Sequence, residues 1–139
     1  MSATGNAENN CFVCGPSNPQ GLQLTFRDED GKAVAECSPA AYLCGWDGVT
    51  HGGIVYSLMD DAMANSLALR GDRGFTARCE VRYRAQTPVE TPLRLEGWET
   101  GRRGRLAMMA ARVLNARSGE VLAEAEARFM LEPRLDAQG

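Results

Sequence analysis

The sequence predicts an α+β fold in which one long helix is covered by a curved antiparallel sheet of five to six strands. The first observation is a single long segment, residues 52–69, that is apolar on almost its whole circumference when it is placed on a helix. A helix of that kind is a buried one. The second observation is that segments after it alternate between apolar and polar residues, as half-buried strands do. One helix and one sheet then bury their apolar faces against each other.

The expected elements follow in a simple order along the chain. Two short strands flank a turn at residues 28–31, where Asp-Glu-Asp-Gly is a hairpin signal. A loop over residues 38–50, interrupted by Pro and Gly, precedes the helix, and Gly71 ends that helix. Turns at 101–104 and 115–119 separate the later strands. The expected strands cover residues 22–26, 33–37, 75–85, 93–98, 106–114 and 121–131.

The chain of 139 residues has the length of one domain, with no internal repeat. We expect a disordered tail over residues 1–10, a single folded domain over residues 11–133 and a loose C-terminal tail over residues 134–139. No run of eighteen apolar residues is present, so no membrane-spanning helix is expected. The first ten residues lack the apolar core of an export signal, which indicates the cytoplasm. A net charge of −3 argues against nucleic acid as a partner.

The five cysteines are expected to be reduced thiols, because no export signal accompanies them. Cys11 and Cys14 form a Cys-x-x-Cys pair, which could be half of a zinc site. Structural zinc takes four ligands, and the chain has no second pair, although Cys37, Cys44 and His51 could in principle complete the set. A packed N-terminal turn is the favoured interpretation, and we expect no metal and no cofactor. A thioredoxin-like redox role is disfavoured, because no βαβ pattern surrounds the pair.

The start of the expected helix, His51-Gly52-Gly53, is a candidate for binding a carbonyl oxygen. Glycine inside a helix costs roughly 1 kcal/mol, and two glycines make sense where a ligand approaches the backbone closely. The first N–H groups of a helix have no partner within it, and the helix dipole favours negative charge there. A carbonyl that develops an oxyanion would be stabilised at this point. The alternative is that the glycines only form a tight turn into the helix.

Two adjacent carboxylates lie further along the same helix. Helical spacing of about 100° per residue places Asp60 on an apolar stripe with Tyr56 and Met63, and Asp61 on a narrow polar stripe with Ser57. Buried carboxylates are rare unless they are paired or functional, so Asp60 is the candidate general base or nucleophile. The alternative for Asp60 is a carboxylate bonded to a neighbouring loop. For Asp61 a structural role is the favoured interpretation.

The segment from His51 through Asp60 and Asp61 resembles the signature helix of the hotdog-fold acyl-CoA thioesterases. The likeness is to the phenylacetate-pathway (PaaI-like) type of the 4-hydroxybenzoyl-CoA thioesterase superfamily, in which an acid follows the His of His-Gly-Gly by nine residues. Cys11-Phe-Val-Cys14-Gly with Asn18-Pro-Gln-Gly-Leu22 is similar to the N-terminal segment of many such proteins. The resemblance spans about residues 11–132.

This resemblance implies hydrolysis of an acyl-CoA thioester. The Gly52 N–H, with Gly53, would bind the carbonyl oxygen, while Asp60 attacks the carbonyl carbon or activates a water. Thr76 matches the hydroxyl residue that opens the next strand in these enzymes, and would orient the water or the acid. Strand alternation places Thr76 opposite Phe75 and Ala77, so we expect it to reach the site only from the end of its strand.

The remaining candidate substrate contacts are His51, Gly53, Gly45 and Asp61. His51 would shape the turn and contact the substrate rather than act as a base. Many relatives carry Asn or Gln six or seven residues before this His, where the present chain has Gly45 and Cys44. A polar contact near the leaving sulfur or the water is then absent from the expected site.

Two other functions remain open from the sequence. Hotdog dehydratases typically pair a His with an acid on the helix, but this helix contains no His after its first residue. A non-catalytic acyl-CoA-binding or regulatory protein on the same fold is the other alternative, since a fold does not define a function.

The spacing of the site predicts a homodimer with shared active sites. His51 and Asp60 are nine residues apart, which is roughly 13 Å along a helix. Both the oxyanion donor and the base must lie within about 3–3.5 Å of the reacting atoms. Two antiparallel helices related by a two-fold axis can meet that requirement, and one helix cannot. The resemblance implies edge-to-edge sheets in the dimer, and a homotetramer in many relatives.

Overall fold

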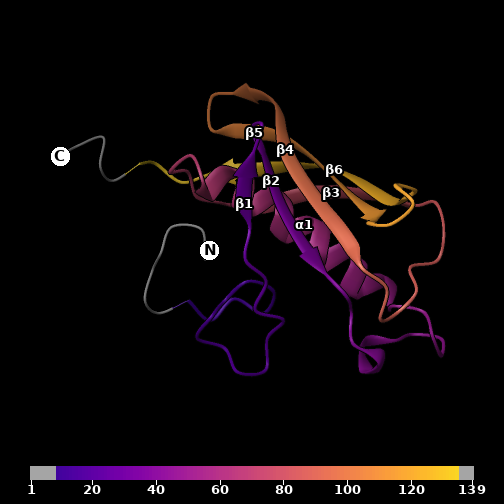
Figure 1. Ribbon diagram of the computed structural model, residues 1–139. Helices are drawn as coiled ribbons and strands as arrows, with labels where there is room; N and C mark the ends of the chain where they lie inside the picture. Colours follow the sequence, from indigo (N-terminus) through magenta and orange to yellow (C-terminus); the bar gives the residue numbers. More distant parts are fainter. Residues whose placement is uncertain (1–8, 135–139) are drawn as a thin grey trace.

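The computed structural model describes residues 9–134 and contains one long helix packed against one six-stranded antiparallel sheet (Figure 1), so the α+β expectation is confirmed. This is the hotdog arrangement. The helix is α1 (Gly52–Ala68), preceded by a single 3-10 turn at Ala41–Leu43. The strands are β1 (Arg27–Glu29), β2 (Lys32–Cys37), β3 (Gly74–Tyr83), β4 (Leu93–Arg103), β5 (Leu106–Asn115) and β6 (Val121–Leu131).

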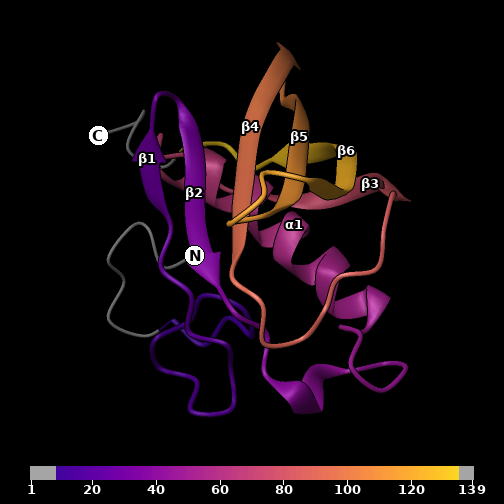
Figure 2. The same ribbon diagram turned by 45° about the vertical axis from the view of Figure 1, so that its right-hand side comes forward.

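The sheet has the strand order β1-β2-β4-β5-β6-β3, so β1 and β3 are its two edges. Figure 2 shows β1, β2 and β4 standing nearly upright while β3 and β6 cross them at a steep angle. The sheet therefore twists strongly as it passes around α1, in the right-handed sense that L-residues favour. In consequence α1 lies in the hollow of the sheet, close to both of its halves.

The first strand lies later than the sequence predicted. Residues 22–26 do not form a strand; the N–H groups of Leu22 and Leu24 instead donate to the carbonyls of Phe12 and Val13, at 2.8 and 2.9 Å. The strand β1 begins only at Arg27, and Asp30-Gly31 turns the chain into β2. Both turn residues have positive φ, 53° and 85°, as in the primed turns that suit a tight hairpin. An apolar alternation could not reveal that residues 22–24 have a partner in the N-terminal segment.

The β4–β5 turn also lies later than expected. Arg103 pairs with Leu106, so Gly104 and Arg105 make the turn, and Gly101 remains within β4 beside a register shift. Gly104 has a φ of 60°, which is a conformation that glycine adopts without steric cost. The two hairpin strands are therefore longer than the turn signal at residues 101–104 indicated.

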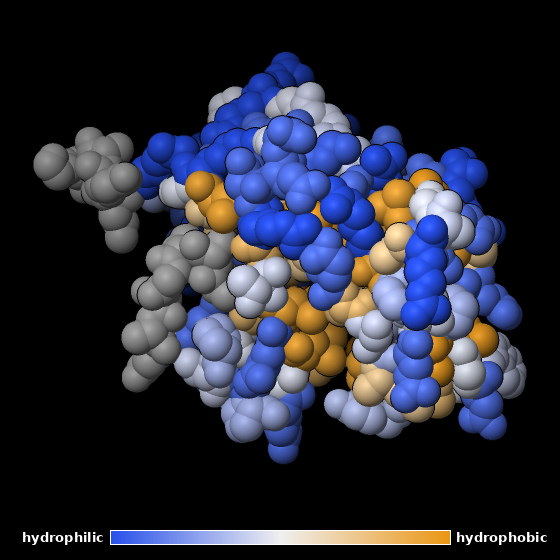
Figure 3. All heavy atoms as spheres, viewed as in Figure 1, coloured by the Kyte–Doolittle hydropathy of each residue, from blue (hydrophilic) through white to orange (hydrophobic). Residues whose placement is uncertain are grey.

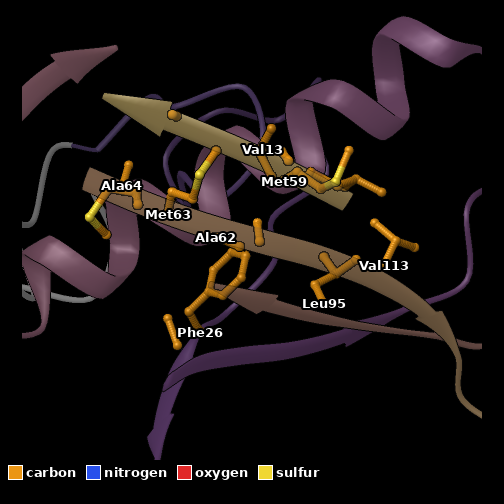
Figure 4. Close-up of a cluster of buried hydrophobic side chains, with 14 of the residues drawn as sticks. Val13, Phe26, Met59, Ala62, Met63, Ala64, Leu95 and Val113 are labelled. Carbon is orange, nitrogen blue, oxygen red and sulfur yellow. The ribbon is translucent and has the colours of Figure 1, made fainter. Parts of the chain in front are cut away.

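The core lies between α1 and the inner face of the sheet (Figure 4). Gly97, in the middle of β4, faces the backbone of Ala62, and a Cβ there would lie 2.4 Å from the Ala62 carbonyl atoms. Only glycine allows this approach, so the helix rests directly on the middle of the sheet. The labelled members of the core are Val13, Phe26, Met59, Ala62, Met63, Ala64, Leu95 and Val113, all buried.

The N-terminal segment, defined here as residues 9–24, is folded against the helix rather than extended from it. Asn9 is buried, and its carbonyl accepts the N–H of Ser17 at 2.9 Å. At the other end of the described chain, Arg134 donates to the Asp72 carboxylate at 2.6 Å. Residues 1–8 and 135–139, which make up most of the two expected tails, lie outside the described residues, and the domain bounds remain predictions. No described helix has the length and apolar character needed to cross a membrane.

Candidate active site

The imidazole of His51 caps the helix that His51 itself precedes. Its Nδ1 accepts the N–H of Gly53 at 2.9 Å, which satisfies one of the free donors of the first turn. A Cβ on Gly53 would lie only 3.1 Å from that nitrogen, so the second glycine lets the ring fold back over the backbone. The Gly53 N–H is thus engaged by the imidazole, and a part for Gly53 in binding the carbonyl oxygen stays a prediction.

The first glycine, Gly52, is exposed and holds the free donor. No acceptor for its N–H is found among the described residues 9–134, whereas its carbonyl accepts the Tyr83 hydroxyl at 2.8 Å. Gly52 lines a cavity of about 580 Å³ with His51, Trp46 and Tyr83. The loop before α1, the first turn of α1 and the end of β3 form its walls. One backbone donor at a positive helix end is thus presented to an accessible cavity.

Gly45 lies against the ring of His51. A Cβ at this position would be 3.4 Å from both the Cα and the Cδ2 atoms of His51, and Gly45 also lines the cavity. A longer side chain here would press on the imidazole that caps α1. The loop and the ring are therefore in close contact at Gly45.

Asp60 lies about two helical turns after Gly52 in α1, and its side chain is hydrogen-bonded to a residue of β3. Its Oδ1 accepts the hydroxyl of Thr76 at 2.5 Å, and both residues are only partly buried. A carboxylate offers two oxygens, so the second oxygen of Asp60 is left for a water or a substrate atom. The pairing of these two expected residues is a property of the fold, because sixteen positions separate them in the chain.

The position of Thr76 is explained by a β-bulge. Thr76 pairs with Phe129 and Arg78 with Arg128, so Ala77 has no partner and the alternation shifts by one residue. Thr76 consequently faces α1 together with Cys79 and Tyr83, while Phe75 remains exposed on the other side. The prediction that Thr76 reaches the site only from the end of its strand is wrong, since the bulge turns its side chain toward the helix.

Asp61 points about 100° away from Asp60 around α1. It is the more deeply buried of the two acids, with 4% of its surface exposed. Its Oδ1 accepts the Cys11 thiol at 3.2 Å, and its Oδ2 accepts the Asn65 amide at 2.9 Å. Burial raises the pKa of Asp61 above the usual range, and burial also raises the pKa of Cys11 to about 12. Asp61 lines none of the cavity at Gly52, and its contact with a substrate stays a prediction.

The burial of the two acids is therefore the reverse of what the helical wheel indicated. The N-terminal segment covers Asp61 and Asn65, and Asn65 has no exposed surface. Among the described residues 9–134, none covers Tyr56 and Asp60 to the same degree. The wheel placed the side chains correctly around the helix but could not tell which side a neighbouring segment would seal.

Sequence reasoning missed two tyrosines of the site. Tyr83 joins the start of α1 to the end of β3, and Tyr56 lies one helical turn before Asp60. A hydrogen bond with Cys79, followed by burial, raises the pKa of Tyr56 to about 12, so its phenol stays protonated. The alternation of residues 75–85 showed Tyr83 only as a strand residue. No sequence signal linked its hydroxyl to Gly52.

The candidate site residues thus form two separate groups on α1. His51, Gly52, Gly53 and Gly45 gather at its first turn, whereas Asp60 and Thr76 meet near its middle. Gly52 and Asp60 are eight residues apart, or about 12 Å along the helix. A carbonyl bound at Gly52 would not be in reach of Asp60 of the same chain.

A second, smaller hollow of about 180 Å³ lies beside the first turns of α1. Ile54 and Leu58 of the helix line it, together with Leu22 and Leu24 of the N-terminal segment and Leu43 of the loop. On the face shown in Figure 3, apolar residues gather in the lower half between the N-terminal segment and that loop, while the upper part is hydrophilic. The hollow is suited to an apolar group.

A long helix in the hollow of a twisted six-stranded antiparallel sheet defines the hotdog class of folds. The chain belongs to the thioesterase superfamily, since the model of that family matches residues 47–122, more than half of the sequence. The match includes α1 and the strands β3, β4 and β5.

Known proteins that resemble the chain support its membership of this superfamily. The human acyl-coenzyme A thioesterase THEM5 is 30% identical over 68 residues, which are 49% of this chain and 28% of that protein. The crystal structure of a thioesterase superfamily protein superimposes with a TM-score of 0.82 and 28% identity, over 88% of this chain and 60% of the other. PaaI from the phenylacetic acid degradation operon of E. coli has the same fold, with a TM-score of 0.74 and 16% identity over 81% and 82% of the two chains. The present chain thus spans little more than a quarter of its curated relative.

Proposed function

We propose that the protein hydrolyses acyl-CoA thioesters, with Asp60 as the base and the Gly52 N–H as the oxyanion donor. The main support is the hydrogen bond that the Thr76 hydroxyl donates to the Asp60 carboxylate on the open side of α1. The free Gly52 N–H in the cavity at the start of the helix adds to it. The superfamily of the chain and the name of its human relative support a thioester of coenzyme A as substrate.

The geometry suggests the following reaction. The Gly52 N–H binds the thioester carbonyl oxygen and stabilises the charge that forms on it. Asp60 removes a proton from a water, whose oxygen attacks the carbonyl carbon while Thr76 fixes the orientation of the carboxylate. The carbon–sulfur bond then breaks, and the CoA thiolate takes up the proton, which leaves a free acid and CoA. Direct attack by Asp60 on the carbonyl carbon is the alternative first step.

The site requires two copies of the chain, so we infer a homodimer with two shared sites. Gly52 of one copy and Asp60 of the other would face the same carbonyl group. Two features of the single chain support this: the side of α1 that carries Tyr56 and Asp60 is incompletely covered, and β3 is an edge strand of ten residues. Edge strands of this length are usually paired or protected. A homotetramer would form from two such dimers.

Subunit mixing tests the shared site directly. Asp60→Asn removes the base, and Gly52→Pro removes the N–H; proline is well tolerated at the first position of a helix, so the second variant should fold. Each variant alone should be inactive. After exchange between equal amounts, half of the dimers are mixed and carry one working site of two, which gives about a quarter of full activity. No recovery despite demonstrated exchange, or an active monomer, would show that the shared site is wrong.

Thiol release from a panel of acyl-CoA compounds tests the activity itself. The apolar hollow at Ile54 and Leu58 is small, so it offers room for a compact apolar acyl group. We expect free CoA to appear with at least one aryl, branched or medium-chain member of the panel. Tight binding of acyl-CoA without any release of CoA would instead favour the non-catalytic binding protein. Formation of an unsaturated product from a hydroxyacyl-CoA would favour the dehydratase.

A further inference from the structure

The N-terminal Cys-x-x-Cys pair and Asp61 come together beneath the helix. The sulfur atoms of Cys11 and Cys14 and a carboxylate oxygen of Asp61 all lie within 4.8 Å of one another. Cys14 and Asp61 are buried and Cys11 is half-buried, so the cluster is sheltered yet reachable from one side. Fifty residues separate Cys11 from Asp61, and the fold alone brings them into contact at 3.2 Å.

The turn that carries the two cysteines is shaped around the Cys11 sulfur. The Gly15 N–H donates to the Cys11 carbonyl at 2.9 Å, and the backbone at Cys14 and Val13 acts to lower the pKa of the Cys11 thiol, against the larger opposite effect of burial. A Cβ on Gly15 would lie 2.3 Å from the Cys11 nitrogen, so only glycine fits there. Backbone contacts that favour a thiolate fix a sulfur ligand and strengthen its binding of a metal.

A fourth polar side chain, Asn65, reaches the same cluster. It has no exposed surface, and its amide nitrogen lies 2.9 Å from Asp61 Oδ2 and 3.6 Å from Cys14 Sγ. Within residues 9–134 its Oδ1 has no hydrogen-bond partner, which is unusual for a buried polar atom. A half-turn of the amide exchanges the oxygen and the nitrogen. It gives up the hydrogen bonds to the carboxylate and the carbonyl of Asp61, and directs Oδ1 into the cluster as a ligand to a cation.

We propose that Cys11, Cys14 and Asp61 bind a zinc ion, with Asn65 completing the ligand set, and that the ion clamps the N-terminal segment to α1. Two thiolates select a thiophilic cation of this kind, and structural zinc takes four ligands. Tetrahedral bonds of about 2.3 Å to sulfur and 2.0–2.2 Å to oxygen separate the ligand atoms by roughly 3.3–3.8 Å. The distances within the cluster need only small adjustments to reach this geometry.

The sequence led us to expect no metal, and the proposed zinc site reverses that expectation. The reason is a ligand that only the structure reveals. The sequence offered Cys37, Cys44 and His51 as additional ligands, and none of them belongs to the cluster in the described part of the chain. The missing ligand is Asp61, which a single Cys-x-x-Cys pattern does not reveal. The site is structural rather than catalytic, because Asp61 faces away from the Gly52 cavity.

Metal analysis of matched variants tests the site. Protein prepared in zinc-containing medium and kept reduced should carry about one zinc ion per chain. Cys14→Ser should lose the ion, and Asp61→Asn should release it to a chromophoric chelator at a lower chelator concentration. Cys37→Ser and Asp60→Asn serve as controls and should retain it. Zinc that is absent from the reduced wild-type protein after zinc addition, or that persists in the Cys11→Ser/Cys14→Ser double variant, overturns the proposal.

Cobalt substitution gives a readout on the unaltered chain, so it does not depend on the folding of a variant. Reduced wild-type protein freed of metal and titrated with Co²⁺ should develop the near-ultraviolet absorption of cobalt–thiolate bonds and the visible bands of a tetrahedral ion. Zinc should displace the cobalt and abolish both. A titration without cobalt–thiolate absorption, or with the bands of a six-coordinate ion, contradicts the site.

Discussion

The two sides of α1 present neighbouring carboxylates to opposite surroundings. Asp60 is partly exposed, bonded to one hydroxyl from β3, and turned toward the side of the helix that a single chain leaves open. Asp61 is buried beneath the N-terminal segment, and its carboxylate accepts hydrogen bonds from a thiol and an amide. Consecutive helical residues point about 100° apart, so two identical side chains can take a chemical and a structural role. Their surroundings, rather than their residue type, separate the two roles.

The largest effect that this contrast predicts is on turnover. Asp60→Asn removes the base without changing the size of the side chain, and should lower kcat by about 10²–10⁴-fold. Asp61→Asn should lower it far less, because that acid does not line the cavity. Steady-state thiol release by both variants, with circular dichroism to verify the fold, measures the difference. A greater loss from Asp61→Asn would mean that the roles of the two acids are exchanged.

Thr76→Val should have the next largest effect on activity. It removes the hydroxyl that donates to Asp60, and a hydrogen bond to a charged group contributes about 1.5–3 kcal/mol. If that bond positions the base in the transition state, kcat falls roughly 10–150-fold, since 1.36 kcal/mol is a factor of ten. Thr76→Ser keeps the hydroxyl and should retain most of the activity. Equal activities in the valine and serine variants would remove Thr76 from the mechanism.

For stability the order of the two acids should be reversed, so that substitution of Asp61 costs more unfolding free energy than substitution of Asp60. Asp61→Ala removes the carboxylate that accepts the Cys11 thiol and the Asn65 amide, and leaves the amide only the Asp61 carbonyl and the Cys14 sulfur; this should cost about 1–3 kcal/mol of unfolding free energy. Asp60→Ala should cost less, because Asp60 is partly exposed and water can replace it as a partner. Urea unfolding in the presence of a chelator measures both without a contribution from bound metal. Equal losses would show that the two sides of the helix do not differ in this way.

Tyr83→Phe should have the smallest effect of the four. It removes only the hydroxyl that donates to the Gly52 carbonyl, a neutral bond that contributes about 0.5–1.5 kcal/mol. We expect kcat/KM to fall by roughly 2–10-fold, because the donor at Gly52 becomes less well fixed. Thr100→Val is the matched control, since it also removes a hydroxyl that donates to a backbone carbonyl, that of Met108, and Thr100 lines neither the Gly52 cavity nor the apolar hollow. A decrease of the same size in the control would show that the loss at Tyr83 is not specific.

The order of the helix and the strands could be predicted from the sequence, because the spacing of apolar residues follows directly from which residues are buried. The helix was expected at residues 52–69 and lies at Gly52–Ala68, and the last strand was expected and found at residues 121–131. The first strand was misplaced, because the partner of residues 22–24 lies in the irregular N-terminal segment. Alternation gives the faces of a strand, whereas pairing between irregular segments leaves no such pattern.

The candidate site was predictable in its residues but not in its surroundings. The Gly-Gly start of the helix and the acid nine residues after His51 are features of the sequence itself. The burial of Asp61 depends on a segment fifty residues away, and a helical wheel contains no information about that segment. Likewise, the Tyr83 contact to Gly52 joins two elements whose proximity only the sheet order establishes.

The bulge at Ala77 has an evolutionary consequence. Substitution of Ala77 itself should be tolerated, because it is exposed and unpaired. Its deletion would restore an unbroken ladder in which Thr76 still pairs with Phe129 and Arg78 with Arg128, so that Thr76 would keep its inward place. A deletion nearer the middle of β3 would instead turn the residues on one side of it to the opposite face. Lineages of this fold that retain the chemistry should therefore accumulate many residue types, and also gaps, at position 77 and almost no gaps elsewhere in the strand.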